Sequence, residues 1–168
     1  MTSPLKTKYP LHEVLLIKKR RVEDAERVVK EMQEKLNAEK EKLRKREEER
    51  NKVLNHRNDK LKQLRATLDK ESTTPKIQQM KAYLKVVDQK LIVEEKKVAD
   101  QKTQVDIAEK NLEMARHELK KKRLEVDKIL QHKKGWTVEL IKEFEIAEGR
   151  ENDEIGNIIH SLNQRRTS

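Results

Sequence analysis

The sequence has no cysteine and very few glycines, prolines and aromatic residues. Without cysteine, disulfide bonds and thiolate metal sites are excluded. Three glycines and three prolines are few for 168 residues, and 33% hydrophobic residues are too few to fill a globular core. The high content of charged residues is typical either of a long-helix protein or of a disordered chain.

Long hydrophobic runs are absent as well. The N-terminal residues MTSPLK have no apolar segment of the kind found in a secretory signal. No stretch approaches the ~18 uninterrupted apolar residues of a membrane-spanning helix. We therefore expect no direct membrane insertion and a location in the cytosol.

The sequence does contain apolar residues at alternating steps of three and four positions over a long segment. Such a narrow stripe, repeating every 3.5 residues, is typical of a coiled coil, and a disordered chain has no reason to keep this phase. A helix of this length needs a partner helix of similar length. The predicted seam positions are Ile77, Met80, Leu84, Val87, Leu91, Glu94, Val98, Gln101, Val105, Ala108, Leu112, Ala115, Leu119, Lys122, Val126, Ile129, Lys133, Trp136 and Leu140.

A second seam lies earlier in the chain. It runs through Leu15, Val22, Ala25, Val29, Met32, Leu36, Leu43, Leu54, Leu61, Leu64 and Leu68. The one clear break between the seams is at residues 72–75, where Thr74 can cap a helix that starts at Pro75. The predicted fold class is all-α: a long antiparallel two-helix coiled-coil hairpin. Residues 1–9 are a tail, residues 10–134 the hairpin with its tip at 72–75, and residues 135–168 an overhanging C-terminal helix and tail.

Folding at this tip pairs residue i roughly with residue 145 − i, so that Leu36 meets Ala108. Both seams become polar at the same level, near residues 44–53 and 93–101. We predict a soft midsection there, and we expect replacement of Glu94 and Gln101 by Leu to raise thermal stability. The overhang has no partner in the chain, so its apolar residues predict a binding surface, a dimer contact or a frayed tail. These residues are Trp136, Leu140, Ile141 and Phe144.

Two basic runs fall at nearly the same level of the hairpin, near its base. They are Lys18, Lys19, Arg20 and Arg21, and Lys120, Lys121, Lys122 and Arg123. The band has three open readings: a solvated helix face, a docking site for an acidic protein, or a nucleic-acid site. Nucleic acid is the least favoured, because aromatic stacking residues are nearly absent. Near the tip, Tyr83 and Val86 either pack beside the coiled coil or form an exposed contact patch.

Motifs that carry chemistry are absent. The five histidines do not have the spacing of a zinc site, and there is no glycine-rich phosphate loop and no Ser/His/Asp arrangement. A two-helix rod also has no concave pocket that could desolvate a substrate. We therefore predict no enzymatic activity, no catalytic residue, no metal site and no cofactor.

The run from Tyr9 to Glu26, YPLHEVLLIKKRRVEDAE, resembles the N-terminus of the type III secretion stalk proteins, the YscO family and its flagellar counterpart FliJ. The segment from Met80 to Val87, MKAYLKVV, is similar to the chlamydial members. The resemblance implies a virulence-associated coupling stalk at the cytoplasmic face of the apparatus in the bacterial cytoplasm. The implied partners are the hexameric secretion ATPase, an export gate protein and secretion chaperones. The alternatives are a generic coiled-coil scaffold and a coiled coil that binds nucleic acid.

Overall fold

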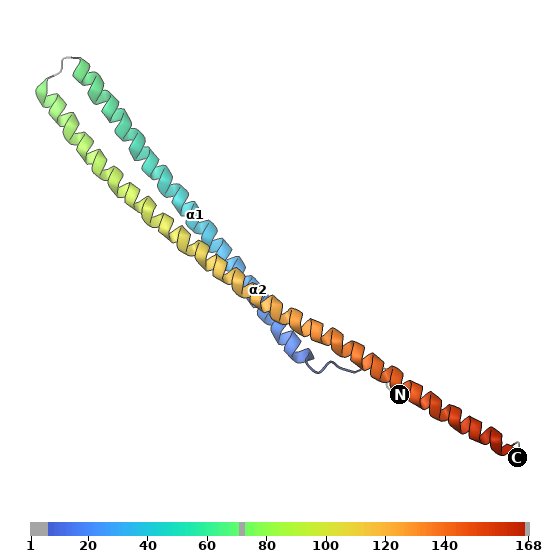
Figure 1. The fold of residues 1–168 in the computed structure, drawn as a ribbon. Helices are drawn as coiled ribbons and strands as arrows, with labels where there is room; N and C mark the ends of the chain where they lie inside the picture. The colour runs from blue at the N-terminus through green and yellow to red at the C-terminus, as the bar shows by residue number, and fades with distance from the viewer. Residues whose placement is uncertain (1–6, 71–72, 167–168) are drawn as a thin grey trace. The chain divides into compact units, whose positions relative to one another are not determined.

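The computed structural model describes residues 7–70 and 73–166 and contains two long helices (Figure 1). Helix α1 runs from His12 to Asp69 and α2 from Thr74 to Arg166. No strand occurs in these two ranges. The predicted fold class is therefore confirmed: the protein is all-α, with two long helices packed against each other.

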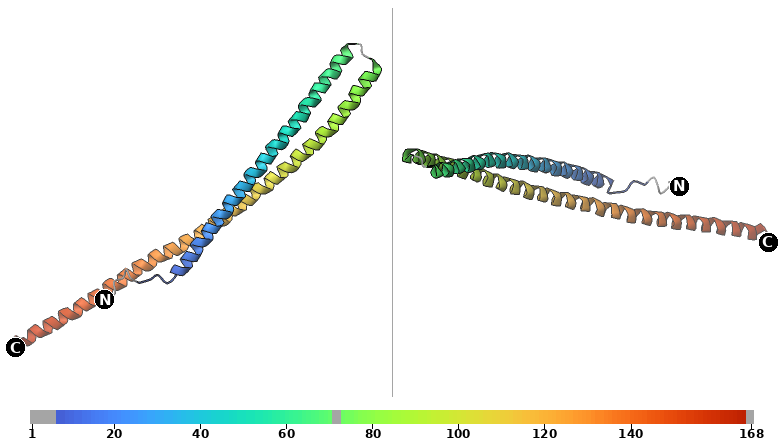
Figure 2. Two further views of the ribbon diagram at one scale, coloured as in Figure 1. Left: turned by 180° about the vertical axis from the view of Figure 1, so that it is seen from behind. Right: turned by 90° about the horizontal axis from the view of Figure 1, so that it is seen from above.

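The chain divides into two compact units. The tip unit is Glu26–Glu118 and contains the end of α1 and the start of α2. The base unit consists of Met1–Ala25 and Leu119–Ser168. In the tip unit the two helices run side by side in both further views (Figure 2).

The seam predicted for α2 is confirmed. All of its positions from Ile77 to Leu140 are buried or half-buried, including the polar Glu94 and Gln101. A strict alternation of three and four residues keeps these side chains on one side of a gently supercoiled helix, which explains why no position drifts into solvent.

The seam of α1 is also confirmed, except at its end. Leu15, Leu36 and Leu64 are buried, whereas Leu68 is exposed and Thr67 is half-buried in its place. The prediction for Leu68 was wrong because a four-residue step from Leu64 carries the side chain past the interface. The three-residue step reaches Thr67 instead.

Contacts in the tip unit confirm the predicted pairing to within a helical turn. Leu36 packs with Val105 and Leu112, and Ala108 lies against this cluster. Nearer the tip, Arg57 Nε lies 2.5 Å from an Asp88 carboxylate oxygen, the partner that the rule names. In the base unit, Lys18 Nζ lies 2.5 Å from Glu125 Oε2, two residues from its predicted partner.

The helix starts differ slightly from the prediction. Helix α1 begins at His12 and not at Pro10, because Tyr9 O accepts a hydrogen bond from His12 N and the residues between them form a turn. Helix α2 begins at Thr74, and Thr73 O accepts hydrogen bonds from the amides of Lys76 and Ile77. Ser72, part of the predicted tip, lies outside the described residues.

The polar midsection of the tip unit contains two different environments. The Gln101 amide donates to the main-chain oxygen of Glu39 at 3.1 Å and to Glu39 Oε2 at 2.6 Å. Glu94 Oε2 and Arg50 Nε, in contrast, are buried with no hydrogen-bond partner among the described residues. A buried polar atom without a partner costs stability, whereas the bonded Gln101 does not carry that cost.

We predict that the two polar positions respond in opposite directions to apolar substitution. Glu94 Oε1 accepts a hydrogen bond from the exposed Lys97, so only the buried Glu94 Oε2 and Arg50 Nε lack partners in the described part of the chain. Replacing the two side chains together, with Arg50→Met and Glu94→Leu, should raise the melting temperature by a few degrees, about 1 kcal/mol. Gln101→Leu should lower it, contrary to the expectation from the sequence, because the main-chain oxygen and Oε2 of Glu39 lose the Gln101 donor. Thermal melts followed by circular dichroism measure both. A higher melting temperature for Gln101→Leu would contradict the assignment.

Residues 44–53 and 93–101 should also be the least protected internal segments of the tip unit, because their seam buries little apolar area. Amide hydrogen exchange measures this. Equal protection at Leu36, Leu43 and Leu61 and in these segments would show that ion pairs compensate for the missing apolar contacts.

Candidate interaction surfaces

The predicted basic band lies within the base unit, but its members have different environments. Lys18 and Lys122 are half-buried and face Glu125, at 2.5 Å and 3.9 Å. The other six side chains are exposed: Lys19, Arg20, Arg21, Lys120, Lys121 and Arg123. Lys18 therefore joins α1 to α2, Lys122 contacts Glu125 within α2, and the outer six form the surface that a partner can reach.

The Lys18–Glu125 contact has an electrostatic signature. The hydrogen bond from Lys18 lowers the pKa of Glu125, and the charges of Lys18, Lys122 and Arg21 add to that direction. A carboxylate with a lowered pKa stays charged at neutral pH, which favours the ion pair.

The start of α1 carries exposed aliphatic side chains that the sequence reasoning missed. Leu11, Val14, Leu16 and Ile17 are all exposed, and Ile17 is 51% exposed. Only Leu15 in this run is a seam residue. The signal was available: residues 14–17 read VLLI, more apolar residues than a seam needs in one turn.

The segment Thr7–Leu11, which we name the strap, lies against α2. Its Tyr9 is only 4% exposed, and the Tyr9 hydroxyl shares a hydrogen bond of 2.7 Å with His132 Nδ1. The Tyr9 ring meets Trp136 edge to face, with centroids 5.4 Å apart, and Lys133 Nζ lies 6.0 Å from the ring centroid. Aromatic and cation–π contacts of this geometry are stabilising.

The strap corrects one sequence prediction. Trp136 was expected to have no partner in the chain, but Tyr9 covers it. The pairing rule itself matches residue 9 with residue 136, and the prediction failed because residues 1–9 were treated as a tail. A non-helical segment can still follow the partner helix when an aromatic side chain anchors it.

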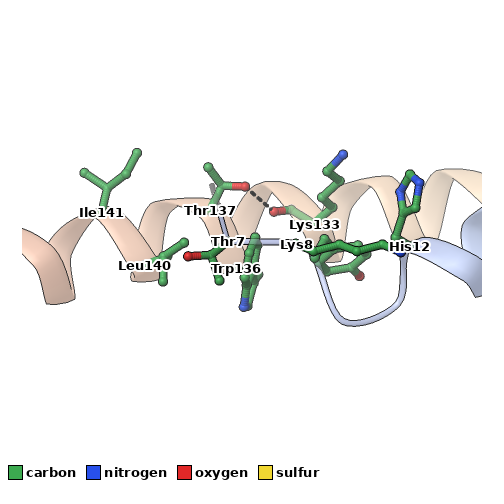
Figure 3. A pocket seen from close by; sticks show the side chains of 9 residues that line it. Thr7, Lys8, His12, Lys133, Trp136, Thr137, Leu140 and Ile141 are labelled. Atoms are coloured by element: carbon green, nitrogen blue, oxygen red, sulfur yellow. Dashed lines mark hydrogen bonds between the residues drawn. The ribbon is translucent and has the colours of Figure 1, made fainter. Parts of the chain in front are cut away.

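A pocket of about 330 Å³ opens between the strap and α2 (Figure 3). Thr7, Lys8 and Tyr9 line it from the strap, and His12 from the start of α1. The α2 side consists of Lys133, Trp136, Thr137, Leu140 and Ile141. The Thr137 hydroxyl donates to Lys133 O at 2.8 Å, so its methyl group and not its polar atom is free to face the cavity.

Beyond the pocket, the C-terminal part of α2 is exposed throughout. Phe144 is half-buried, and every residue from 145 to 165 is exposed. Ile155, Ile158, Ile159 and Leu162 in this stretch are each more than half exposed. Most of the charged residues from Glu139 to Glu154 are acidic, in contrast to the basic band.

The predicted tip patch lies in the tip unit. Tyr83 and Val86 are exposed and line a groove of about 580 Å³ with Lys60, Gln63, Lys76 and Met80. The Tyr83 hydroxyl shares a hydrogen bond of 3.0 Å with His56 Nε2, and Lys60 Nζ lies 5.8 Å from the ring centroid. The structure thus brings both predicted residues together and adds two contacts from α1 that fix the ring.

Within the described residues, no three His, Cys, Asp or Glu side chains are placed to hold a metal ion. In the same part of the chain, neither helix contains a stretch that is apolar enough to cross a membrane.

These features define a class: a basic two-helix hairpin whose off-seam apolar residues gather at particular places. Comparisons with known proteins agree with the class and name the family. The sequence model of the YscO-like proteins matches residues 6–166. The chain therefore belongs to the YscO-like family, which associates it with type III secretion.

A solved structure, described as a homolog of YscO, CT670 from Chlamydia trachomatis, is similar to this chain. The two share 48% sequence identity and a TM-score of 0.90, over 95% of this chain and 98% of that one. A search of curated proteins found no match.

We predict that Lys18→Met raises the pKa of Glu125 towards its ordinary value of 4.5. Because the folded pKa is lowered, the stabilising contribution of Glu125 is present above its unfolded pKa and is lost as pH falls through the folded pKa. Carboxyl NMR titration measures the shift, with Lys19→Met as the matched control. An unchanged Glu125 titration in Lys18→Met would contradict the contact.

Proposed function

We propose that this chain is the central coupling stalk of a type III secretion system. Its base binds the hexameric secretion ATPase, and its tip patch serves the export gate protein and secretion chaperones. It acts at the cytoplasmic face of the apparatus, in the bacterial cytoplasm. It has no catalytic role of its own and requires no cofactor.

The observation that carries this proposal is the exposed aliphatic turn at the start of α1. Val14 and Leu16 are two residues apart, so they point to opposite flanks of a helix with 3.6 residues per turn. Ile17 faces the side away from the buried Leu15. A partner that covers all three must contact the helix from several sides, as a ring-shaped protein does.

The charges at the base add to this argument. Three of the six outer cations, Lys19, Arg20 and Arg21, directly follow the aliphatic turn along α1, and the other three lie on α2 in the same unit. Apolar contacts next to exposed cations suit a partner with an acidic rim around an apolar patch. The exposed C-terminal part of α2 supplies further apolar side chains, which lie among acidic residues instead of basic ones.

The test reverses charge at the base and, as a matched control, at the tip. The triple variant Lys19→Glu, Arg20→Glu, Lys120→Glu should weaken binding to the purified secretion ATPase and its stimulation by about tenfold or more. Lys62→Glu, Lys81→Glu, Lys85→Glu changes three exposed lysines of the tip unit and should leave this binding intact. Circular dichroism checks that both variants keep their helices, and sedimentation or calorimetry measures binding.

The salt dependence separates the charged contacts from the apolar ones. Binding through the basic band should fall with salt, since exposed charges are screened over ~10 Å at 0.1 M. Truncation after Phe144 removes the exposed end of α2 and should weaken binding with a smaller salt dependence. If Tyr83→Ala with Val86→Ala abolished ATPase binding while the charge-reversed base retained it, the proposed direction of the stalk would be wrong. Strong salt-dependent binding to duplex DNA without ATPase binding would favour the nucleic-acid reading.

A further inference from the structure

We propose that the strap and α2 together form a docking pocket for a bulky apolar side chain flanked by carboxylates, presented by a segment of a partner protein. This inference deepens the proposed function, because it specifies the chemistry that the base of the stalk recognises.

The inner surface of the pocket is apolar. Tyr9, Trp136, Leu140 and Ile141 line it, and Ile141 is 42% exposed beside the half-buried Leu140. At about 330 Å³, the cavity has the size of the smaller ligand sites in proteins. Such a hollow suits a side chain that enters from outside.

The rim of the pocket is basic. Lys8, His12 and Lys133 lie around it, and no Asp or Glu belongs to the described lining. Lys8 forms an ion pair with Glu13, whose carboxylate lies 2.8 Å from Lys8 Nζ. Lys133 is held near the Tyr9 ring. Two lysines at the rim of an apolar floor select an apolar group that brings carboxylates with it.

Tyr9 is the positioning residue of the pocket. Its hydrogen bond to His132 and its edge contact with Trp136 hold the strap on α2. The wall formed by Thr7 and Lys8 exists only while the strap is held there (Figure 3). Releasing Tyr9 should therefore remove the pocket without breaking either helix.

Trp136 allows a direct test, because it is the only tryptophan of the chain. The probe is the capped tripeptide acetyl-Glu-Leu-Glu-amide, titrated against the full chain while Trp136 emission is recorded. We expect a saturable change in emission. The peptides acetyl-Lys-Leu-Lys-amide and acetyl-Glu-Ala-Glu-amide should bind about tenfold more weakly or not at all.

Two pairs of variants locate the site. Ile141→Glu places a carboxylate in the lining and should abolish the response, whereas Ile146→Glu, 56% exposed and outside the pocket, should not. Tyr9→Ala should abolish it with unchanged helical content, and Tyr9→Phe should restore much of it, because the ring is retained. Equal responses to the Glu and Lys peptides, or an undiminished response in Ile141→Glu, would overturn the proposal.

Binding to the secretion ATPase separates this inference from the proposed function. Ile141→Glu and Tyr9→Ala should each weaken ATPase binding, and Ile92→Glu, at an equally exposed position of the tip unit, should not. If the charge-reversed base loses the ATPase but both pocket variants keep it, the pocket is not a docking site and the proposed function stands. If the peptides bind as expected but the unaltered chain does not bind the ATPase, the pocket stands and the proposed partner is wrong.

Discussion

The burial of one narrow apolar seam between α1 and α2 is the interaction on which the rest of this protein depends. The chain has no disulfide, few aromatic residues and no globular core, so the seam is the main source of apolar burial. Its period of 3.5 residues keeps Leu36, Val105 and Leu112 in one cluster and sets which residues face each other. Ion pairs such as Arg57–Asp88 and Lys18–Glu125 then lie beside the seam and follow its register.

A narrow seam also leaves most of each helix surface free for other contacts. Off-seam apolar residues are not needed for the fold, so their positions point to partners. In the base unit some of them lie at the start of α1 and beside the strap pocket, and in the tip unit some border the groove at Tyr83. Others, such as Ile92, Ile107 and Met114, lie elsewhere along the helices. The proposed function depends on this division, because the seam has to persist while the outer surface binds and releases other proteins.

In the polar midsection the seam lacks the apolar burial that stabilises the rest of the hairpin. Gln101 is bonded to Glu39, but Arg50 and Glu94 keep buried atoms without hydrogen bonds among the described residues. Natural coiled coils use such polar layers to fix register, at a cost in stability. Here the layer also separates two apolar stretches of the tip unit, around Leu36 and around Leu64, which is the reason for the prediction that the hairpin opens first at this level.

The sequence by itself determined the helices, the seam and the register, because heptad spacing is a local pattern that directly fixes which side chains share a face. It also located the basic band and the tip patch, and the run from Tyr9 to Glu26 indicated the family. Only the tertiary structure showed that Lys18 faces Glu125, that Leu68 lies outside the seam and that Tyr9 covers Trp136. These features depend on contacts between segments more than a hundred residues apart, or on a small rotation at a helix end, and no local period specifies them.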